Sequence, residues 1–320
     1  MKINKRKILI TGGSGFIGSH LVRRLLELSN EIIILDNFST GRFENLRGVE
    51  DRISNIIEGD IQNLKDIEEA LDEVDIIFHY AADPYVKDSV YNPVNNFEIN
   101  VMGTLNLLEV MRKVGIKQIV FASSGGTLYG DVKMDKIPTK EDVQFNPISP
   151  YGASKASCES YLSAYSSSYD FIVTSVRFAN IYGPFSDHGV MYDFFHKLKQ
   201  NKEQLEILGD GSQIKSYMYI SDCIDATLIA AENTNTGFEA FNLGVERVAS
   251  VNEIANLVVK EMNLKDVEYI YTGGERGWVG DVKRSSLSIE KIKSLGWKPK
   301  FTLKEGVRKY INWLKEHENY

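Results

Sequence analysis

The chain has few of the residues that disulfide-rich or metal-binding proteins require. Its 320 residues include only two cysteines, Cys158 and Cys223, which provide neither a disulfide framework nor a cysteine-based metal cluster. Its five histidines are scattered and form no close ligand pair, so we expect no metal site. This composition fits a reducing, cytoplasmic setting.

Long hydrophobic runs and an excess of positive charge are also absent. No apolar run approaches the roughly 18 residues needed to cross a bilayer, so we expect no contact with a membrane. The net charge is −7, from 44 acidic and 37 basic residues. That balance argues against nucleic acid as the main partner, because binding a phosphate backbone requires clustered positive charge.

A glycine-rich turn near the N-terminus predicts a phosphate-binding site. An apolar run at 8–10 predicts a buried strand, and a helical pattern begins at Phe16 and Ile17. The glycines between them are Gly12, Gly15 and Gly18. A strand, a glycine turn and a helix N-terminus aim unpaired backbone N–H groups at one point, which suits a pyrophosphate.

The end of the next strand indicates which dinucleotide this turn would hold. An apolar run at 32–35 ends at Asp36. An acidic side chain there accepts hydrogen bonds from an adenosine ribose and repels a 2′-phosphate, so we expect NAD rather than NADP. Arg42 lies close enough in sequence to complicate the exclusion of NADP. The alternative is a turn that merely needs glycine, followed by a solvated aspartate.

Strand and helix patterns alternate through the first 180 residues. We expect strands at 8–11, 32–36, 54–58, 76–79, 119–123 and 172–178, and helices notably at 63–71, 94–114 and 151–169. Near-continuous apolar strands separated by helices specify a doubly wound, Rossmann-type α/β fold with a parallel sheet. We expect residues 1–180 to form the NAD-binding domain. Residues 181–320 would form a smaller α/β substrate lobe, with some segments returning to the first domain.

The segment from Tyr151 to Lys155 supplies a candidate catalytic pair. Four residues apart in a helix, the two side chains share one face. An ammonium group beside a phenol favours phenolate and lowers the phenol pKa from about 10 towards neutrality. Tyr151 would then remove a proton from a sugar hydroxyl, and Lys155 would also hold the nicotinamide ribose. The alternative is a helical Tyr and Lys with no shared role.

Together these motifs resemble the extended short-chain dehydrogenase/reductase family, and most closely its nucleotide-sugar epimerases and dehydratases of the UDP-galactose 4-epimerase type. Ordered matches continue at 36–41, 59–61, 79–82, 123–130, 177–184, 209–213, 219–222, 242–244 and 295–299. The resemblance implies transient oxidation of a UDP-sugar at C4 by NAD, with hydride then returned to the opposite face. It also implies a homodimer formed through the helices at 94–114 and 151–169.

The resemblance assigns roles to individual positions. The residues expected to border the cofactor are Gly12, Gly15, Phe16, Ile17, Asp36, Asn37, Asp60, Ile61, Ala81, Ala82, Asn100, Ser123, Tyr151 and Lys155. The residues expected to bind the nucleotide sugar are Lys87, Asn180, Lys215, Arg276 and Ser285. The alternatives are structural, with Ala81 small for packing, Asn180 capping a turn and Lys215 a solvated surface charge.

The segment after the fifth expected strand departs from the family pattern. Where family members usually carry a Ser or Thr that bonds the reacting sugar oxygen, this chain has Gly125. Thr127 is the expected substitute, with Ser124 behind it. Family dehydratases carry Asp-Glu where this chain has Gly126-Thr127, and eliminating water needs that acid and base. Epimerisation, which needs one reversible base, is therefore favoured.

The substrate end departs from the pattern as well. Lys215 stands where the family usually has Arg and supplies charge without a bidentate fork, so we expect looser phosphate holding with Arg276 as a second clamp. Ser285 is small where related epimerases exclude an N-acetyl group, which predicts turnover of UDP-GlcNAc/UDP-GalNAc as well as UDP-Glc/UDP-Gal. The alternatives are a uronate epimerase or keto-sugar reductase of the same family, and a non-catalytic NAD-binding regulator.

Overall fold

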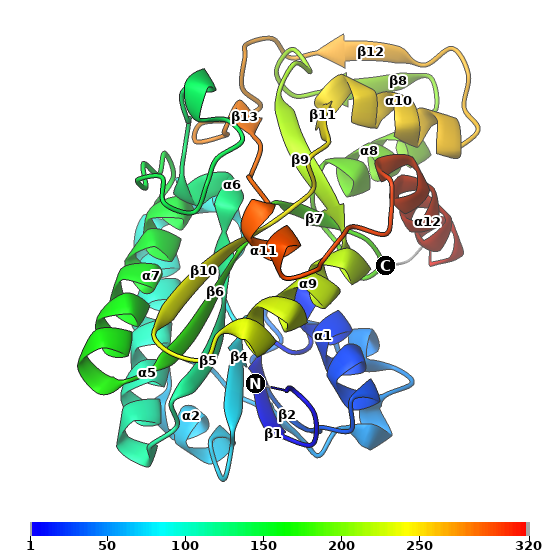
Figure 1. The fold of residues 1–320 in the computed structure, drawn as a ribbon. Helices are drawn as coiled ribbons and strands as arrows, with labels where there is room; N and C mark the ends of the chain where they lie inside the picture. The colour runs from blue at the N-terminus through cyan, green and yellow to red at the C-terminus, as the bar shows by residue number, and fades with distance from the viewer. Residues whose placement is uncertain (1, 318–320) are drawn as a thin grey trace.

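The computed structural model of the protein describes residues 2–317, and a parallel sheet of seven strands forms its centre (Figure 1). The strand order is β10-β6-β5-β4-β1-β2-β3. The strands are β1 (Lys7–Thr11), β2 (Glu31–Asp36), β3 (Asn55–Glu58), β4 (Ile76–His79), β5 (Gln118–Ser124), β6 (Ile172–Phe178) and β10 (Phe238–Leu243). Every neighbouring pair runs parallel, as the expected doubly wound fold requires.

Helices cover both faces of this sheet. On one face, α1 (Phe16–Glu27) and α9 (Ile220–Asn233) form one apolar cluster with Ile8 and Ile10 of β1. On the other face, Leu9 meets a second apolar cluster that includes α2 (Leu64–Ala70), α5 (Gly103–Val114) and α7 (Pro150–Tyr169). Successive side chains of a strand point to opposite faces, so one apolar run supplies both cores.

Two details of this domain differ from the sequence prediction. The strand β10 was not among the expected strands, although some segments of the second half were expected to return to the first domain, and it pairs with β6 at the edge of the sheet. The helix expected at 94–114 is three pieces: α4 (Pro93–Phe97), the π-helical turn η3 (Glu98–Met102) and α5. A π turn leaves the apolar pattern nearly helical, so periodicity alone does not reveal it.

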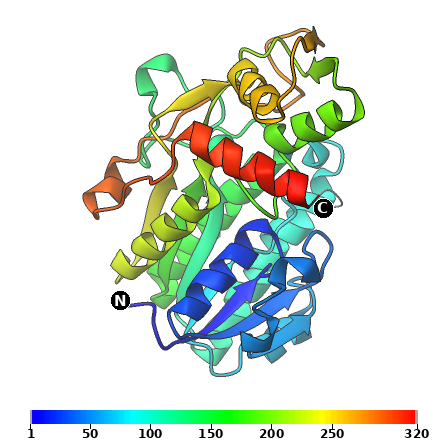
Figure 2. The same ribbon diagram turned by 90° about the vertical axis from the view of Figure 1, so that its right-hand side faces the viewer.

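The second half of the chain builds two further small sheets. In the four-stranded sheet, the central strand β9 (Ile214–Tyr219) pairs with β7 (Asn180–Tyr182), β11 (Val248–Ser250) and β13 (Arg284–Ser285). The strands β8 (Gln204–Ile207) and β12 (Glu268–Tyr271) form a parallel pair. The helices α8 (Val190–Gln200), α10 (Val251–Glu261) and α12 (Leu303–Glu316) enclose one apolar core with them. Figure 2 shows α12 in red, with α10 above it and α1 below it.

Short elements complete the described chain. They are η1 (Phe43–Leu46), η2 (Glu50–Arg52), α3 (Val86–Ser89), α6 (Gly125–Leu128), η4 (Met134–Lys136) and α11 (Glu290–Ser294). Within residues 2–317, none of the helices combines the length and the apolar character that crossing a membrane demands.

Candidate active site

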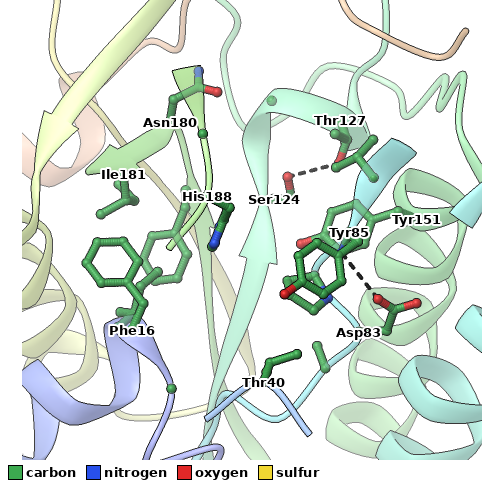
Figure 3. Close-up of a pocket in the computed structure, with 18 of the residues that line it drawn as sticks. Phe16, Thr40, Asp83, Tyr85, Ser124, Thr127, Tyr151, Asn180, Ile181 and His188 are labelled. Carbon is green, nitrogen blue, oxygen red and sulfur yellow. Dashed lines mark hydrogen bonds between the residues drawn. The ribbon is translucent and has the colours of Figure 1, made fainter. Parts of the chain in front are cut away.

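A cavity of about 870 Å³ opens at the carboxyl ends of the sheet strands and extends into the second half of the chain. Its wall runs from Gly12, after β1, past Tyr151 on α7 to Lys215 on β9. Figure 3 shows Ser124, Thr127 and Tyr151 on one side of the cavity, with Phe16, Asn180 and Ile181 on the other. The carboxyl edge is where ligands bind in open α/β sheets.

The glycine turn at the start of α1 can hold a pyrophosphate only because it lacks side chains. Gly12 has φ +69°, and a Cβ there would lie 2.7 Å from the backbone nitrogen of Ala81. A Cβ on Gly18 would lie 2.1 Å from the Gly12 carbonyl oxygen. The glycine turn before α1 and the loop after β4 therefore lie so close together that a side chain at Gly12 would collide with the loop backbone. This cradle fits the phosphates of a dinucleotide.

Asp36 lies at the end of β2 and faces the same cavity. It is 6% exposed, and its carboxylate accepts hydrogen bonds from the backbone nitrogens of Ser14 at 2.8 Å and Phe38 at 2.9 Å. Burial raises the pKa of this carboxyl above its usual range. Each oxygen keeps a lone pair for a ribose hydroxyl, so the acid also fits NAD. Arg42 instead reaches Asp187, with Nη2 3.4 Å from Oδ2.

Most residues expected to border the cofactor line the cavity. They are Gly12, Gly15, Phe16, Ile17, Asp36, Asn37, Asp60, Ile61, Ala81, Ala82, Ser123, Tyr151 and Lys155. Asn100 does not line it and lies behind the wall, where its Oδ1 accepts from the Asp83 backbone nitrogen at 2.8 Å and its Nδ2 donates to Ser154 Oγ at 3.0 Å. Asn100 therefore ties the loop after β4 to the catalytic helix.

The start of the catalytic helix α7 is fixed by its capping residues. Ser149 is the N-cap, and its hydroxyl accepts a hydrogen bond from the Gly152 nitrogen at 3.2 Å, with Pro150 in the first turn. This start places Tyr151 and Lys155 on one face of the helix. The Lys155 Nζ lies 5.8 Å from the centroid of the Tyr151 ring and donates to the Ala122 carbonyl at 3.0 Å.

Ser124, at the end of β5, lies between the other two hydroxyls of the site. Thr127 Oγ1 donates a hydrogen bond of 2.9 Å to Ser124 Oγ, and Ser124 is hydrogen-bonded to the Tyr151 phenol. Ser124 and Thr127 both line the cavity, and the expectation that Thr127 rather than Ser124 bonds the sugar oxygen stays a prediction. Ser123 turns inward instead, and its hydroxyl donates to Glu159 Oε1 at 2.6 Å. Glu159 is also in a buried ion pair with Arg177, at 2.7 Å.

The structure does not show the expected lowering of the Tyr151 pKa. Burial raises the pKa of Tyr151, more than the hydrogen bond with Ser124 lowers it, and the Asp83 carboxylate raises it further. Burial also lowers the pKa of Lys155. Burial thus disfavours the charged form of both side chains.

Lys215 and Arg276, the two expected phosphate clamps, occupy different places. Lys215 lines the cavity with a side chain only 15% exposed, and its Nζ lies 2.6 Å from Asp281 Oδ1. It is therefore not a solvated surface charge. Arg276 does not line the cavity; it contacts the Asp131 carboxylate and the Asp281 carbonyl. The sequence could not separate them, because the contact that turns Arg276 away is with Asp131, in a distant segment of the chain.

The remaining predicted substrate residues do line the cavity. Asn180 lies on β7, and its amide donates to the Ser216 carbonyl at 3.1 Å, so it anchors β7 to β9. Ser285 is buried on β13, and Lys87 is exposed at the rim on α3. Among the described residues, no group of three His, Cys, Asp or Glu side chains could hold a metal ion.

The cavity also contains polar and aromatic residues that the sequence analysis missed. They are Asp83, Tyr85, His188, Gln213, Tyr217 and Trp278. One signal was available for two of them. Gln213, Lys215 and Tyr217 alternate along an extended segment, so placing Lys215 in the site places the other two beside it. No periodic signal marks the loop residues.

A doubly wound sheet, a glycine cradle and a Tyr-Lys pair in the cavity wall define a dinucleotide-dependent enzyme. The family model for the NAD dependent epimerase/dehydratase family matches residues 8–244, and the chain belongs to this family. The predicted fold class, family and cofactor NAD are thereby confirmed.

Relatives match over nearly the whole chain. A putative UDP-glucose 4-epimerase of Methanocaldococcus jannaschii is 39% identical over 316 residues, which covers 97% of this chain and 99% of the relative. The structure of UDP-glucose 4-epimerase from Thermotoga maritima with UDP-glucose is 36% identical, with a TM-score of 0.88 and coverage of 98% and 99%. That of UDP-N-acetylglucosamine 4-epimerase from Methanobrevibacter ruminantium, in complex with UDP-N-acetylmuramic acid, is 29% identical, with a TM-score of 0.88 and the same coverage.

Proposed function

We propose that the protein is an NAD-dependent 4-epimerase that interconverts UDP-glucose and UDP-galactose. One observation carries the proposal: a single cavity joins the glycine cradle, the Tyr151 phenol and the cation of Lys215. These are the parts needed for a dinucleotide, a reacting hydroxyl and a diphosphate. The Methanocaldococcus and Thermotoga relatives, both described as UDP-glucose 4-epimerases, support the same reaction.

The residues of the chain handle the proton of this reaction. Bound NAD would supply the hydride acceptor and, while oxidised, a positive charge that lowers the pKa of a nearby phenol. Tyr151 takes the proton from the C4 hydroxyl and later returns it. Ser124, bonded to Tyr151, orients the phenol and the sugar oxygen, and Thr127 orients Ser124.

Dehydration fits the cavity less well than epimerisation. Gly126 and Thr127 line it where elimination would need an acid and a base. Epimerisation requires only one proton acceptor, because the hydride that leaves C4 is the one that returns. Looser contacts around the hexose than at the nucleotide would allow the 4-keto sugar to turn between the two steps.

We also propose that the enzyme accepts the N-acetylated pair, UDP-GlcNAc and UDP-GalNAc. Ser285 and Gly126 line the cavity together, and a Cβ on Gly126 would lie 3.8 Å from Ser285 Oγ. Both walls are therefore small at this point. The similarity to a UDP-N-acetylglucosamine 4-epimerase supports this wider substrate range.

A homodimer and a cytoplasmic location complete the proposal. Large apolar side chains are exposed along the segment from 91 to 102 and on α7: Tyr91, Val94, Phe97, Met102 and Tyr161. An apolar stripe on adjacent helices suits a second copy of the same stripe. Light scattering of the wild type and of Phe97→Glu tests the dimer, because the variant should be monomeric.

Both cysteines are free, as is usual for proteins in a reducing compartment, and this supports the proposed cytoplasmic location.

The direct test is turnover with isotopic labelling. Incubation of the NAD-loaded protein with C4-deuterated UDP-glucose should give UDP-galactose that retains the label, with no net release of NADH, and the reverse reaction should reach the same equilibrium. Net NADH or one-way conversion would instead indicate a reductase. Binding of NAD with no turnover across UDP-, GDP- and dTDP-sugars would indicate the regulator.

A further inference from the structure

Asp83 is a carboxylate in the wall of the cavity that neutral groups hold in place. It follows β4, and Figure 3 shows it on the same side of the cavity as Tyr85 and Tyr151. Its Oδ1 accepts a hydrogen bond from the Tyr85 backbone nitrogen at 3.2 Å, and its Oδ2 accepts one from Asn96 Nδ2 at 2.9 Å. Among the described residues, no cationic side chain forms an ion pair with it. The negative charge of Asp83 is therefore fixed but not neutralised.

Two asparagines tie Asp83 to the start of the catalytic helix. Asn100 Nδ2 donates to the Asp83 carbonyl at 3.2 Å and to Ser154 Oγ at 3.0 Å, and Ser154 Oγ donates to the Tyr151 carbonyl at 2.8 Å. Asn96 lies on α4 and Asn100 in the π-helical turn η3. Because the π turn allows both amides to reach Asp83, this irregular turn helps to build the site.

The charge of Asp83 acts on both members of the catalytic pair. Burial raises the pKa of Tyr151, and the Asp83 carboxylate raises it further. Burial lowers the pKa of Lys155, and the Asp83 carboxylate is among the groups that oppose this. Glu159 also lies near Lys155, but it is already paired with Arg177 at 2.7 Å. Asp83 therefore supplies a carboxylate charge to the catalytic end of the cavity that no cation neutralises.

Other carboxylates of the cavity are placed differently. Asp36 and Asp60 follow β2 and β3, and the strands β4 and β1 separate these from β5 and its Ser124. Asp187 and Asp281 also line the cavity, but each is in an ion pair with a cation. The position of Asp83 beside the Tyr-Lys pair is thus not duplicated by these four.

We propose that Asp83 is the counter-charge that stabilises the oxidised form of the bound cofactor. The nicotinamide ring is positively charged in NAD and neutral in NADH, and hydride exchange beside Tyr151 requires the ring at this end of the cavity. A fixed carboxylate attracts only the charged form of the ring. The ammonium of Lys155 acts in the opposite sense, so the two side chains together set the balance between the two forms.

Dialysis of the NAD-loaded protein against mixtures of NAD and NADH, continued until the bound ratio is constant, tests the counter-charge. The near-ultraviolet absorbance of the reduced ring gives the share of NADH on the protein. Asp83→Asn removes the charge and should shift the preference towards NADH by about tenfold, the size expected for one nearby charge at an effective dielectric constant of about 20. A loss of packing would weaken both cofactors alike, whereas loss of the charge changes their ratio.

The hydrogen bonds around Asp83 allow this substitution. Within residues 2–317, Asn96 Oδ1 is buried and has no partner. After the Asn96 amide turns over, this oxygen can accept from the side-chain amide that Asp83→Asn introduces. Thermal melting shows whether the variant is folded. Should it not fold, Asp83→Ser, which keeps an oxygen for the Tyr85 nitrogen, gives the same comparison.

Two control variants separate the local charge from other effects. Asp83→Glu keeps the charge and should keep the wild-type preference to within about threefold. Asp72→Asn removes an exposed carboxylate outside the cavity and should leave the preference unchanged, because solvent and salt screen that charge. The same preference in the wild type and in the folded, uncharged variant would overturn the inference, as would an equal shift in Asp72→Asn. No sugar is present, so the result does not depend on the proposed epimerisation.

Discussion

Leu287 fills the space that a side chain at position 125 would need. A Cβ built on Gly125 would lie 2.5 Å from Leu287 Cδ1 and 3.0 Å from Leu287 Cδ2. Leu287 is 2% exposed and packs in a small cluster with Leu128 and Tyr129. The hydroxyl residue that the family pattern places at 125 is thus excluded by packing. Ser124, which is bonded to both Thr127 and Tyr151, stands beside the phenol instead.

This packing predicts the effect of restoring the family residue. Gly125→Ser should destabilise the protein by roughly 1–3 kcal/mol, because Leu287 has little room to move. Combining it with Leu287→Ala should recover part of the loss relative to the sum of the two single changes. Denaturant unfolding of the four proteins measures this coupling. Strict additivity would show that the two side chains do not compete for space.

Removal of the Tyr151 hydroxyl should abolish most of the activity. Tyr151→Phe should lower kcat by about 10²–10⁴-fold, the usual contribution of a general base, while NAD remains bound. Steady-state rates with UDP-glucose and the NAD content after gel filtration check both parts. Tyr161→Phe, at an exposed position of the same helix, is the control and should keep wild-type rates. A near-normal kcat in Tyr151→Phe would refute the assigned role.

Enlarging Ser285 should narrow the range of sugars. Ser285→Tyr should reduce kcat/KM for UDP-GlcNAc by about 10–100-fold, since overpacking a filled site costs ~1–3 kcal/mol. The value for UDP-glucose should change less. Ser285→Ala keeps the small wall and should leave the ratio of the two substrates unaltered. If the wild type does not turn over UDP-GlcNAc, the small side chain of Ser285 does not determine which sugars are accepted.

The stability of the fold should fall in mild acid because of His79. This side chain is 1% exposed between Thr11 and Thr104, and burial lowers its pKa to about 3, with the Lys155 charge adding to the effect. The unfolded chain takes up the proton near pH 6.5 and the folded chain does not. Stability is therefore full above pH 6.5 and is lost as the pH falls towards 3, by roughly 2 kcal/mol at pH 5.

Comparison with a variant isolates this contribution from those of the carboxylates. His79→Gln will be less stable at every pH, but its free energy of unfolding should drop less between pH 7 and pH 5. Urea unfolding at both pH values gives the two differences. If the free energy of unfolding falls equally in the wild type and in the variant, His79 takes up a proton as readily in the folded chain as in the unfolded chain.

Local sequence determined the elements of the first domain with little ambiguity. The strands at Ile76–His79 and Ile172–Phe178 begin and end as expected, and the N-cap Ser149 and Pro150 start α7. Buried parallel strands are continuous apolar runs, and helix caps are short polar signals, so both are visible in a single sequence. The glycine turn and Asp36 could be predicted as well, because both directly follow such apolar runs.

Only the tertiary structure decided which side chains share the cavity and which pair elsewhere. It brought Gln213 and Trp278 to one end, turned Arg276 towards Asp131, and set Leu287 against Gly125. It also raised the pKa of Tyr151, because the effect of burial exceeds that of the hydrogen bond with Ser124. These outcomes depend on packing and desolvation between segments far apart in the chain, and no spacing along the sequence encodes a dielectric environment.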